Sequence, residues 1–359
     1  MRSVSKLDFS LPMLVALLLC AGLLTISSIS SAPALDHQNL FQKQLLGVAL
    51  SLVPIGLMWW AGRDRIFAFA PFLYFFALLL QASTFVIGKD VNGQTNWIDI
   101  GFLQFQPLEI LKFATILFLA SVMRGGYQGF ASYLAPLALF LPGVGLVVTE
   151  DFGGALVLSV IFLAILFAWR APIWHLALAL VAVAVVFPTV VYPHLKPYQQ
   201  ARLTIFLDPY KDPRGQGYQV IQSTIAVGSG GFEGKGYKQG TQSHNGFVPE
   251  PHNDFVFASF AEEQGFVGSV ALLVVFALLL WRLAGMATDA PRLQDQLVFA
   301  GVLGQIGFQV IENIGAALSM LPLTGITLPL VSYGLSSLVS VLSTLGMAWV
   351  IYRDRFQEI

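Results

Sequence analysis

Long apolar stretches alternate with short polar segments along most of the chain. A helix needs about 20 mostly apolar residues to cross the hydrocarbon core of a bilayer. Ten windows come close to that length, at residues 9–31, 41–61, 66–87, 106–123, 133–149, 152–169, 172–192, 254–281, 295–319 and 327–351. The boundary near 149–152 is the weakest, because only a tight turn separates two apolar runs there. The pattern predicts an all-α, polytopic integral membrane protein with about ten transmembrane helices.

The basic residues between these windows predict the orientation in the membrane. Cytoplasmic loops carry an excess of Lys and Arg. With a cytoplasmic N-terminus, the short outer loops keep only Lys43 and Lys89. The inner segments then hold Arg2, Lys6, Arg63, Arg65, Arg124, Arg170, Arg282, Arg292, Arg353 and Arg355. Both termini are therefore predicted to lie in the cytoplasm.

One long segment outside the membrane, residues 193–253, connects the seventh and eighth windows. Loops longer than about 15 residues are usually functional or disordered, and the interleaved aromatic and aliphatic residues here argue against disorder. Apolar residues at 220, 221, 225 and 226 have the spacing of a short amphipathic helix at the membrane interface. Without repeats or an appended soluble region, residues 1–359 are predicted to form a single transmembrane domain.

Composition excludes some classes of protein. The chain is 56% hydrophobic and only 11% charged, whereas a soluble protein carries roughly a quarter charged residues. The net charge of −1 offers no basic surface for a nucleic acid, so no nucleic-acid partner is expected. The single cysteine, Cys20, allows no internal disulfide.

The junction between the long loop and the eighth window gathers polar side chains. Glu250, His252, Asn253 and Asp254 lie within five residues of one another. Titratable groups at a membrane boundary are costly, which favours a functional site. Asn253 or Asp254 could instead cap the helix that follows. The residue types alone leave both interpretations open.

Other charged residues fall inside or beside the apolar windows. Glu109 and Lys112 are three residues apart, so they share a helix face and either pair or border a polar cavity. Asp151 begins the sixth window as a helix N-terminal charge or as part of an outer cavity. Glu262 would lie about 80° around a helix from Asp254, so both could face one cavity. Glu312 and Asn313 raise the same question in the ninth window.

The glycine-rich stretch 228–240 does not match a nucleotide-binding P-loop, because Gly236 rather than Ser or Thr follows Lys235. Lys235 and Lys238 could still approach an anionic head group, although a solvated turn explains them as well. The histidines lack the spacing of a zinc site. No cofactor is predicted with certainty, and a divalent cation such as Mg²⁺ or Mn²⁺ stays open.

The polar motifs, taken in chain order, resemble the SEDS family of bacterial cell-wall glycan polymerases. The matching stretches are Asn96–Lys112, Glu150–Gly153, Gln222–Ala226, Gly228–Gly231, Gly234–Gly236, Gly240–Ser243, Pro249–Ala258, Leu321–Gly325, Leu328–Pro329 and Ser332–Ser337. Gly240–Ser243 and the short termini resemble the elongation type, RodA, more than the division type, FtsW. Departures from the family pattern stand at Leu108, Thr149–Glu150, Asn253 and Leu335, and none removes a charged group.

The resemblance implies an inverting peptidoglycan glycosyltransferase that polymerises lipid II during cell elongation in the bacterial inner membrane. It implies Asp254 as the general base in an outward-facing cavity. Substrate binding would fall to Arg202, Lys235, Lys238, His252 and Glu262, with cavity or structural roles for Glu109, Lys112, Asp151, Ser332 and Tyr333. Expected partners are lipid II, a class B penicillin-binding protein transpeptidase and membrane proteins of the elongation complex. A lipid II flippase and a non-catalytic scaffold for a transpeptidase are the alternatives.

Overall fold

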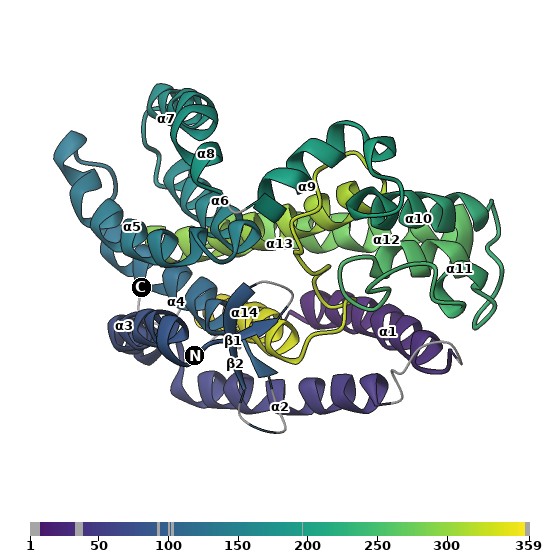
Figure 1. Cartoon of the computed structure of the whole chain (residues 1–359). Helices are drawn as coiled ribbons and strands as arrows, with labels where there is room; N and C mark the ends of the chain where they lie inside the picture. The colour runs from purple at the N-terminus through teal and green to yellow at the C-terminus, as the bar shows by residue number, and fades with distance from the viewer. Residues whose placement is uncertain are drawn as a thin grey trace.

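The computed structural model describes residues 8–32, 39–91, 94–99, 101, 104–195 and 197–355. Its long helices coincide with the ten predicted windows (Figure 1). They are α1 (Ser10–Ser30), α2 (Leu40–Ala61), α3 (Arg63–Ile87), α4 (Pro107–Val122), α5 (Leu134–Val148), α6 (Phe152–Ala168), α7 (Ile173–Val186), α12 (Val256–Asp289), α13 (Leu293–Ala317) and α14 (Leu335–Arg353). Among the described residues, eight helical spans are long and apolar enough to cross a membrane. The helices α4, with 16 residues, and α6, with 17, complete the set. The predicted polytopic helical fold is confirmed.

The core of the bundle is built around α13 and α14, the two most buried of the long spans. Helix α13 packs on α6, α12 and α4, while α14 packs on α2. Small residues allow this approach: a Cβ on Gly304 would lie 2.6 Å from the Cβ of Ala164 on α6. Membrane helices use such positions to bring their backbones together, because lipid offers no hydrophobic driving force between helices.

A small antiparallel sheet between α3 and α4 was not predicted from the sequence. Its strands are β1 (Lys89–Val91), β2 (Gln94–Asp99) and β3 (Gln104–Phe105), in that order. Strands β1 and β3 have only three and two residues, and the six residues of β2 do not alternate between apolar and polar, so the sequence shows no strand pattern here. Residues 100, 102 and 103 of the family-like segment lie outside the described residues.

The long outer segment is ordered by short helices. After η1 (Met123–Gly125) and η2 (Phe130–Tyr133) earlier in the chain, this region holds η3 (Phe187–Val191), α8 (Tyr192–His194), α9 (Pro197–Leu207), η4 (Pro209–Lys211), α10 (Gln216–Ser229) and α11 (Thr241–His244). Helix α10 confirms the predicted amphipathic helix and packs on α12 and α9. Residue 196 lies outside the described residues.

Helix α12 is broken at Gly265, whose φ of 67° and ψ of −166° are not helical. The loop 231–236 supplies partners for the opened turn: Phe266 N donates to Gly231 O at 2.9 Å, and Lys235 N donates to Glu262 O at 3.0 Å. Irregular backbone at membrane depth is tolerated where protein satisfies it in this way. The prediction of one continuous helix over 254–281 is therefore wrong, because the helix begins at Val256 and is interrupted.

The first span begins, and the last span ends, at the same side of the bundle. Arg282, on α12, donates to the side chain of Asp8, which precedes α1. Trp349, on α14, donates its indole N–H to the backbone carbonyl of Asp8 at 2.7 Å. The bond from Trp349 joins the start of the first span to the last span, as an even number of spans requires, and the bond from Arg282 adds the C-terminal part of α12 to this side. Arg2 and Lys6, used in the orientation argument, lie outside the described residues.

Candidate functional site

Asp254 lies in a turn that precedes α12 rather than on the helix itself. The helix begins at Val256, and among the described residues no side chain caps its first turn. The geometry therefore gives no support to a capping role for Asp254. Since a helical angle does not apply to a residue in a turn, the predicted shared face with Glu262 loses its basis.

Three successive backbone carbonyls of this turn accept hydrogen bonds from other parts of the chain. Tyr333 N donates to the carbonyl of residue 252 at 2.8 Å, and the Ser332 hydroxyl donates to that of residue 253 at 2.8 Å. The side-chain amide of Asn313, on α13, donates to the carbonyl of residue 254 at 2.9 Å. The turn is thus fixed by α13 and by the segment that leads into α14.

A cavity of about 360 Å³ opens beside Asp254. Arg202 of α9 and Glu250 line it together with Asp254, and the remaining wall is mostly apolar, from Ile205, Phe206, Gln219, Val220, Pro249, Phe255, Leu321 and Leu323. Charged and apolar walls in one cavity suit an amphiphile with a polar reacting group. The structure brings Asp254 and Arg202 together as predicted.

The carboxyl of Asp254 has an environment suited to proton transfer. Burial raises its pKa to about 6. The positive charge of Arg202 lowers the pKa, and the negative charges of Glu250 and Asp151 raise it further. The side chain nevertheless keeps partial exposure to the cavity. A carboxyl that titrates nearer neutrality is a stronger base than an ordinary aspartate.

Asp151 is both a helix cap and part of a buried polar cluster. Its Oδ1 accepts from Gly154 N at 2.7 Å, which caps α6, and its Oδ2 accepts from Asn96 and Gln106 at 3.3 and 3.0 Å. Burial raises the pKa of Asp151, although the Gly154 N–H opposes the rise. The interpretation of Asp151 as a helix N-terminal cap is confirmed, whereas a place in an outer cavity stays a prediction, since Asp151 does not line the cavity beside Asp254. Asn96 and Gln106 gave no signal of this role beyond their place in the family-like segment.

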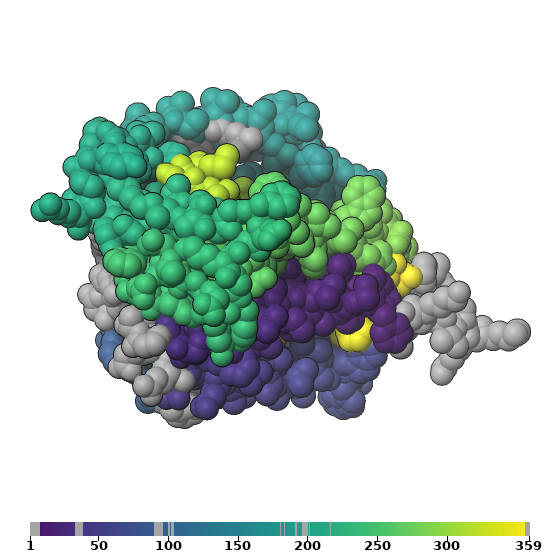
Figure 2. Space-filling model, turned by 90° about the vertical axis from the view of Figure 1, so that its right-hand side faces the viewer, coloured from purple at the N-terminus to yellow at the C-terminus, as the bar shows by residue number. Residues whose placement is uncertain are grey.

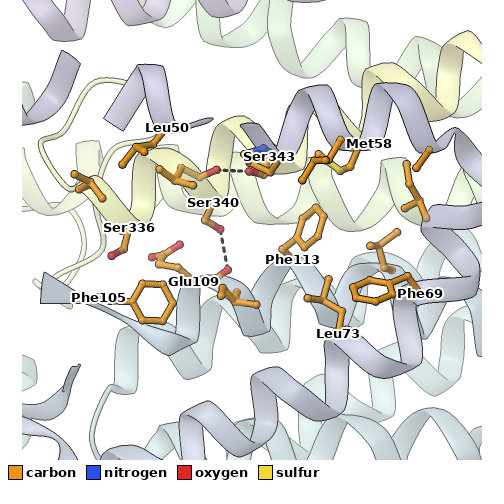
Figure 3. A pocket seen from close by; sticks show the side chains of 18 of the residues that line it. Leu50, Met58, Phe69, Leu73, Phe105, Glu109, Phe113, Ser336, Ser340 and Ser343 are labelled. Atoms are coloured by element: carbon orange, nitrogen blue, oxygen red, sulfur yellow. Dashed lines mark hydrogen bonds between the residues drawn. The ribbon is translucent and has the colours of Figure 1, made fainter. Parts of the chain in front are cut away.

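Glu109 and Lys112 form the predicted ion pair at 2.8 Å, buried in the bundle. Glu109 also borders a second, partly open cavity of about 510 Å³, lined by residues of α2, α3, α4 and α14 and by Phe105 (Figure 3). Apart from Glu109, Arg65 and the hydroxyls of Ser336, Ser340 and Ser343, its lining is apolar. Such a cavity at membrane depth fits a hydrocarbon chain.

Glu262 does not face the cavity beside Asp254, so the prediction that these carboxylates share a cavity is wrong. Its carboxylate pairs with Lys235 at 2.7 Å and accepts from the backbone N–H groups of Gln242 and Ser243 at 2.7 and 3.0 Å. The neighbouring Glu263 accepts from Ser28 of α1 and lies 3.2 Å from His244 Nε2. These bonds fasten the loop to α12 and to the end of α1, and Figure 2 shows green atoms lying against the purple helix.

Replacing Glu262 by Ala should loosen this loop while leaving most of the bundle intact. The change removes the acceptor for several buried donors, and each unsatisfied group costs about 1–3 kcal/mol. Backbone hydrogen exchange at residues 235–244 should therefore become faster than in the wild type. The control is Glu233→Ala, which removes an exposed carboxylate from the same loop. Unchanged protection in the Glu262 variant would contradict the fastening role.

The other predicted site residues have different positions. Lys238 is exposed, with φ of 63°, and its ammonium lies 5.3 Å above the Tyr237 ring. Neither it nor Lys235 lines the cavity of Asp254, so their roles in substrate binding stay predictions. His252 is buried, with its ring 5.5 Å from that of Tyr333. Burial raises the pKa of Tyr333.

Within the described ranges, no group of three or more His, Cys, Asp or Glu residues is arranged to hold a metal ion. A divalent cation stays a prediction.

Comparisons with known proteins agree along nearly the whole chain. A family model of cell cycle proteins named for FtsW, RodA and SpoVE matches residues 9–356. A probable peptidoglycan glycosyltransferase FtsW of Thioalkalivibrio sp. (strain K90mix) is 36% identical over 98% of this chain and 90% of its own length.

Solved structures agree as well. A chain of a peptidoglycan synthase complex that coordinates polymerization and crosslinking is 42% identical, with a TM-score of 0.84, over 98% of this chain and 99% of that one. The rod shape determining protein RodA of Thermus thermophilus is 35% identical, with a TM-score of 0.75 and the same coverage. Since both FtsW and RodA match, the predicted elongation type stays a prediction.

Proposed function

Because the chain belongs to the FtsW, RodA and SpoVE family, also known as SEDS proteins, we propose that it is a peptidoglycan glycosyltransferase that polymerises lipid II. The observation that carries the proposal is the cavity in which Asp254 and Arg202 meet. Within the family we assign the chain to the elongation type, in the bacterial inner membrane with both termini cytoplasmic. A class B penicillin-binding protein is the expected partner, in keeping with the synthase complex that the fold matches.

In the proposed reaction two lipid II molecules meet at the outer side of the bundle. The 4-hydroxyl of one sugar attacks the anomeric carbon of the other, and the bond from that carbon to the pyrophosphate breaks with inversion. The hydroxyl proton passes to the carboxylate of Asp254, and undecaprenyl pyrophosphate leaves. Every atom is accounted for by the two substrates and this one side chain. A general base of this kind contributes typically 10²–10⁴-fold.

Arg202 is suited to the anionic part of the substrate. It lines the cavity with Asp254, and a guanidinium binds phosphate oxygens through two parallel hydrogen bonds. A charge at this place stabilises the negative charge that develops on the leaving pyrophosphate. The apolar walls of the cavity and the separate 510 Å³ cavity beside Glu109 supply space for hydrocarbon. These features support a lipid-linked substrate.

Two assays on the same reconstituted protein distinguish the proposed polymerase from the alternative, a lipid II flippase. Glycan chains formed from purified lipid II are measured by gel electrophoresis, and translocation of fluorescent lipid II is measured across the liposome membrane. The proposed enzyme forms glycan at a fixed membrane face and gives no translocation above that of empty liposomes. Translocation without glycan formation would overturn it.

The polymerisation rate should depend on pH through Asp254. Its carboxylate is the active form of a base, and its pKa in the folded protein is about 6. The value of kcat/KM should therefore fall tenfold per unit below about pH 6 and level off above about pH 7. A profile that stays flat down to pH 4.5 would exclude Asp254 as the base, provided that the protein remains folded there.

A further inference from the structure

We propose that Asn313 is a positioning residue that sets the place of Asp254 in the cavity. This inference rests on the proposed function. Asn313 does not line the cavity. It lies on α13, almost fully buried at 1% exposure, and acts through backbone groups.

Asn313 joins two segments that meet at the base. One N–H of its side-chain amide donates to the carbonyl of Asp254 and the other to the carbonyl of Ile326, both at 2.9 Å. The amide therefore spans the gap between the turn that carries the base and the segment 324–326. Both donors of one rigid planar group are used, so neither segment can shift without breaking a buried hydrogen bond.

The segment 324–326 borders the reacting groups. Gly325 has φ of 82°, and a Cβ placed there would lie 3.6 Å from Arg202 Nη1 and 3.8 Å from Asp254 Oδ2. The preceding residue, Thr324, is held by Glu312, which accepts from its backbone N–H at 3.2 Å and from its hydroxyl. Adjacent residues of α13 thus secure both Thr324 and Asp254.

Position matters for catalysis more than the small energy of these bonds suggests. A neutral hydrogen bond contributes about 0.5–1.5 kcal/mol to stability, but a displacement of about 1 Å at the reacting group can cost about 100-fold in rate. Asn313→Asp would keep the shape of the side chain, but it offers no donor when ionised and a single O–H donor when protonated. At least one of the two backbone carbonyls would lose its hydrogen bond, so one group would no longer hold the two segments together.

The test compares Asn313→Asp and Asn313→Ala with the matched variant Gln309→Glu in lipid II polymerisation. Gln309 is a buried amide one turn earlier on the same helix, so its conversion to an acid places a comparable charge in α13 away from Asp254. Both Asn313 variants should lower kcat at least 10-fold while KM changes less than 3-fold. The acid limb of the pH profile should also move from that of the wild type, whereas Gln309→Glu should leave the limb in place.

Circular dichroism and thermal unfolding accompany each assay. If Asp254→Asn is inactive but both folded Asn313 variants keep the wild-type kcat and pH profile, the positioning role is refuted and the proposed function survives. If both Asn313 variants fail to fold, the amide serves the fold alone and the inference is overturned. If Asp254→Asn itself retains activity, the proposed function fails first.

Discussion

Replacing Asp254 by Asn should reduce glycan synthesis from purified lipid II at least about 100-fold while the protein stays folded. The amide keeps the size and the backbone bonds of the turn but cannot accept the hydroxyl proton. Loss of a positioned general base costs typically 10²–10⁴-fold. Glu250→Gln is the matched control, since that carboxylate lines the same cavity but is far more exposed, with 46% of its side chain accessible. The control should keep its activity within a few fold.

The same variant should be at least as stable as the wild type near pH 7. In the folded protein the pKa of Asp254 is about 6, above its ordinary value of 3.8. The fold therefore favours the protonated form, and stability is lost as pH rises from about 4 through about 6. A shift of one unit corresponds to about 1.4 kcal/mol, and water in the cavity reduces the gain. A markedly lower melting temperature for Asp254→Asn would mean that lost activity reflects unfolding.

Replacing Arg63 by Ala should lower the unfolding free energy by about 3–5 kcal/mol, the cost of leaving a buried charge without its partner. Arg63, at the start of α3, is 2% exposed and lies 3.3 Å from Asp295 of α13, which is fully buried. It also donates through its backbone N–H to Asp354 after α14 at 3.1 Å. Arg63 thus links three helices, through its side chain and its backbone, at the side where the chain begins and ends.

Arg65→Ala provides the comparison for this effect. Arg65 is exposed, two residues further along the same helix, with its guanidinium 5.4 Å above the Trp60 ring. An exposed cation–π contact is worth about 0.5–1 kcal/mol, so thermal unfolding in detergent should separate the two variants by many degrees. Equal losses would mean that the Arg63 cluster contributes no more than surface charge.

Much of the fold follows from hydrophobic length alone. Each of the ten apolar windows corresponds to a helix in the structure, because a helix pairs all its backbone N–H and C=O groups within one segment and a bilayer-spanning stretch has few alternatives. The break at Gly265 could not be read in the same way, since its backbone partners come from the loop 231–236 about 30 residues earlier. A pattern along one segment does not contain the groups that another segment donates.

The candidate site shows the same division. Asp254 and Arg202 were both chosen from the sequence, and the structure places them in one cavity. Glu262 was placed wrongly, because its partners, Lys235 and the backbone of 242–243, are known only once the loop has folded back. Asn313 was noticed without a role, since what it holds is main chain and carries no sequence signal.

The loop 231–236 forms backbone hydrogen bonds on both sides of the break at Gly265, to the carbonyls of Glu262 and Glu263 before it and from the N–H groups of Phe266 and Val267 after it. The loop thus takes the place of the helical turn that Gly265 interrupts. Helix α12 begins at Val256, two residues after Asp254. An insertion or deletion in this loop is therefore also a change to the helix that follows the base, although the two are separate segments of the chain.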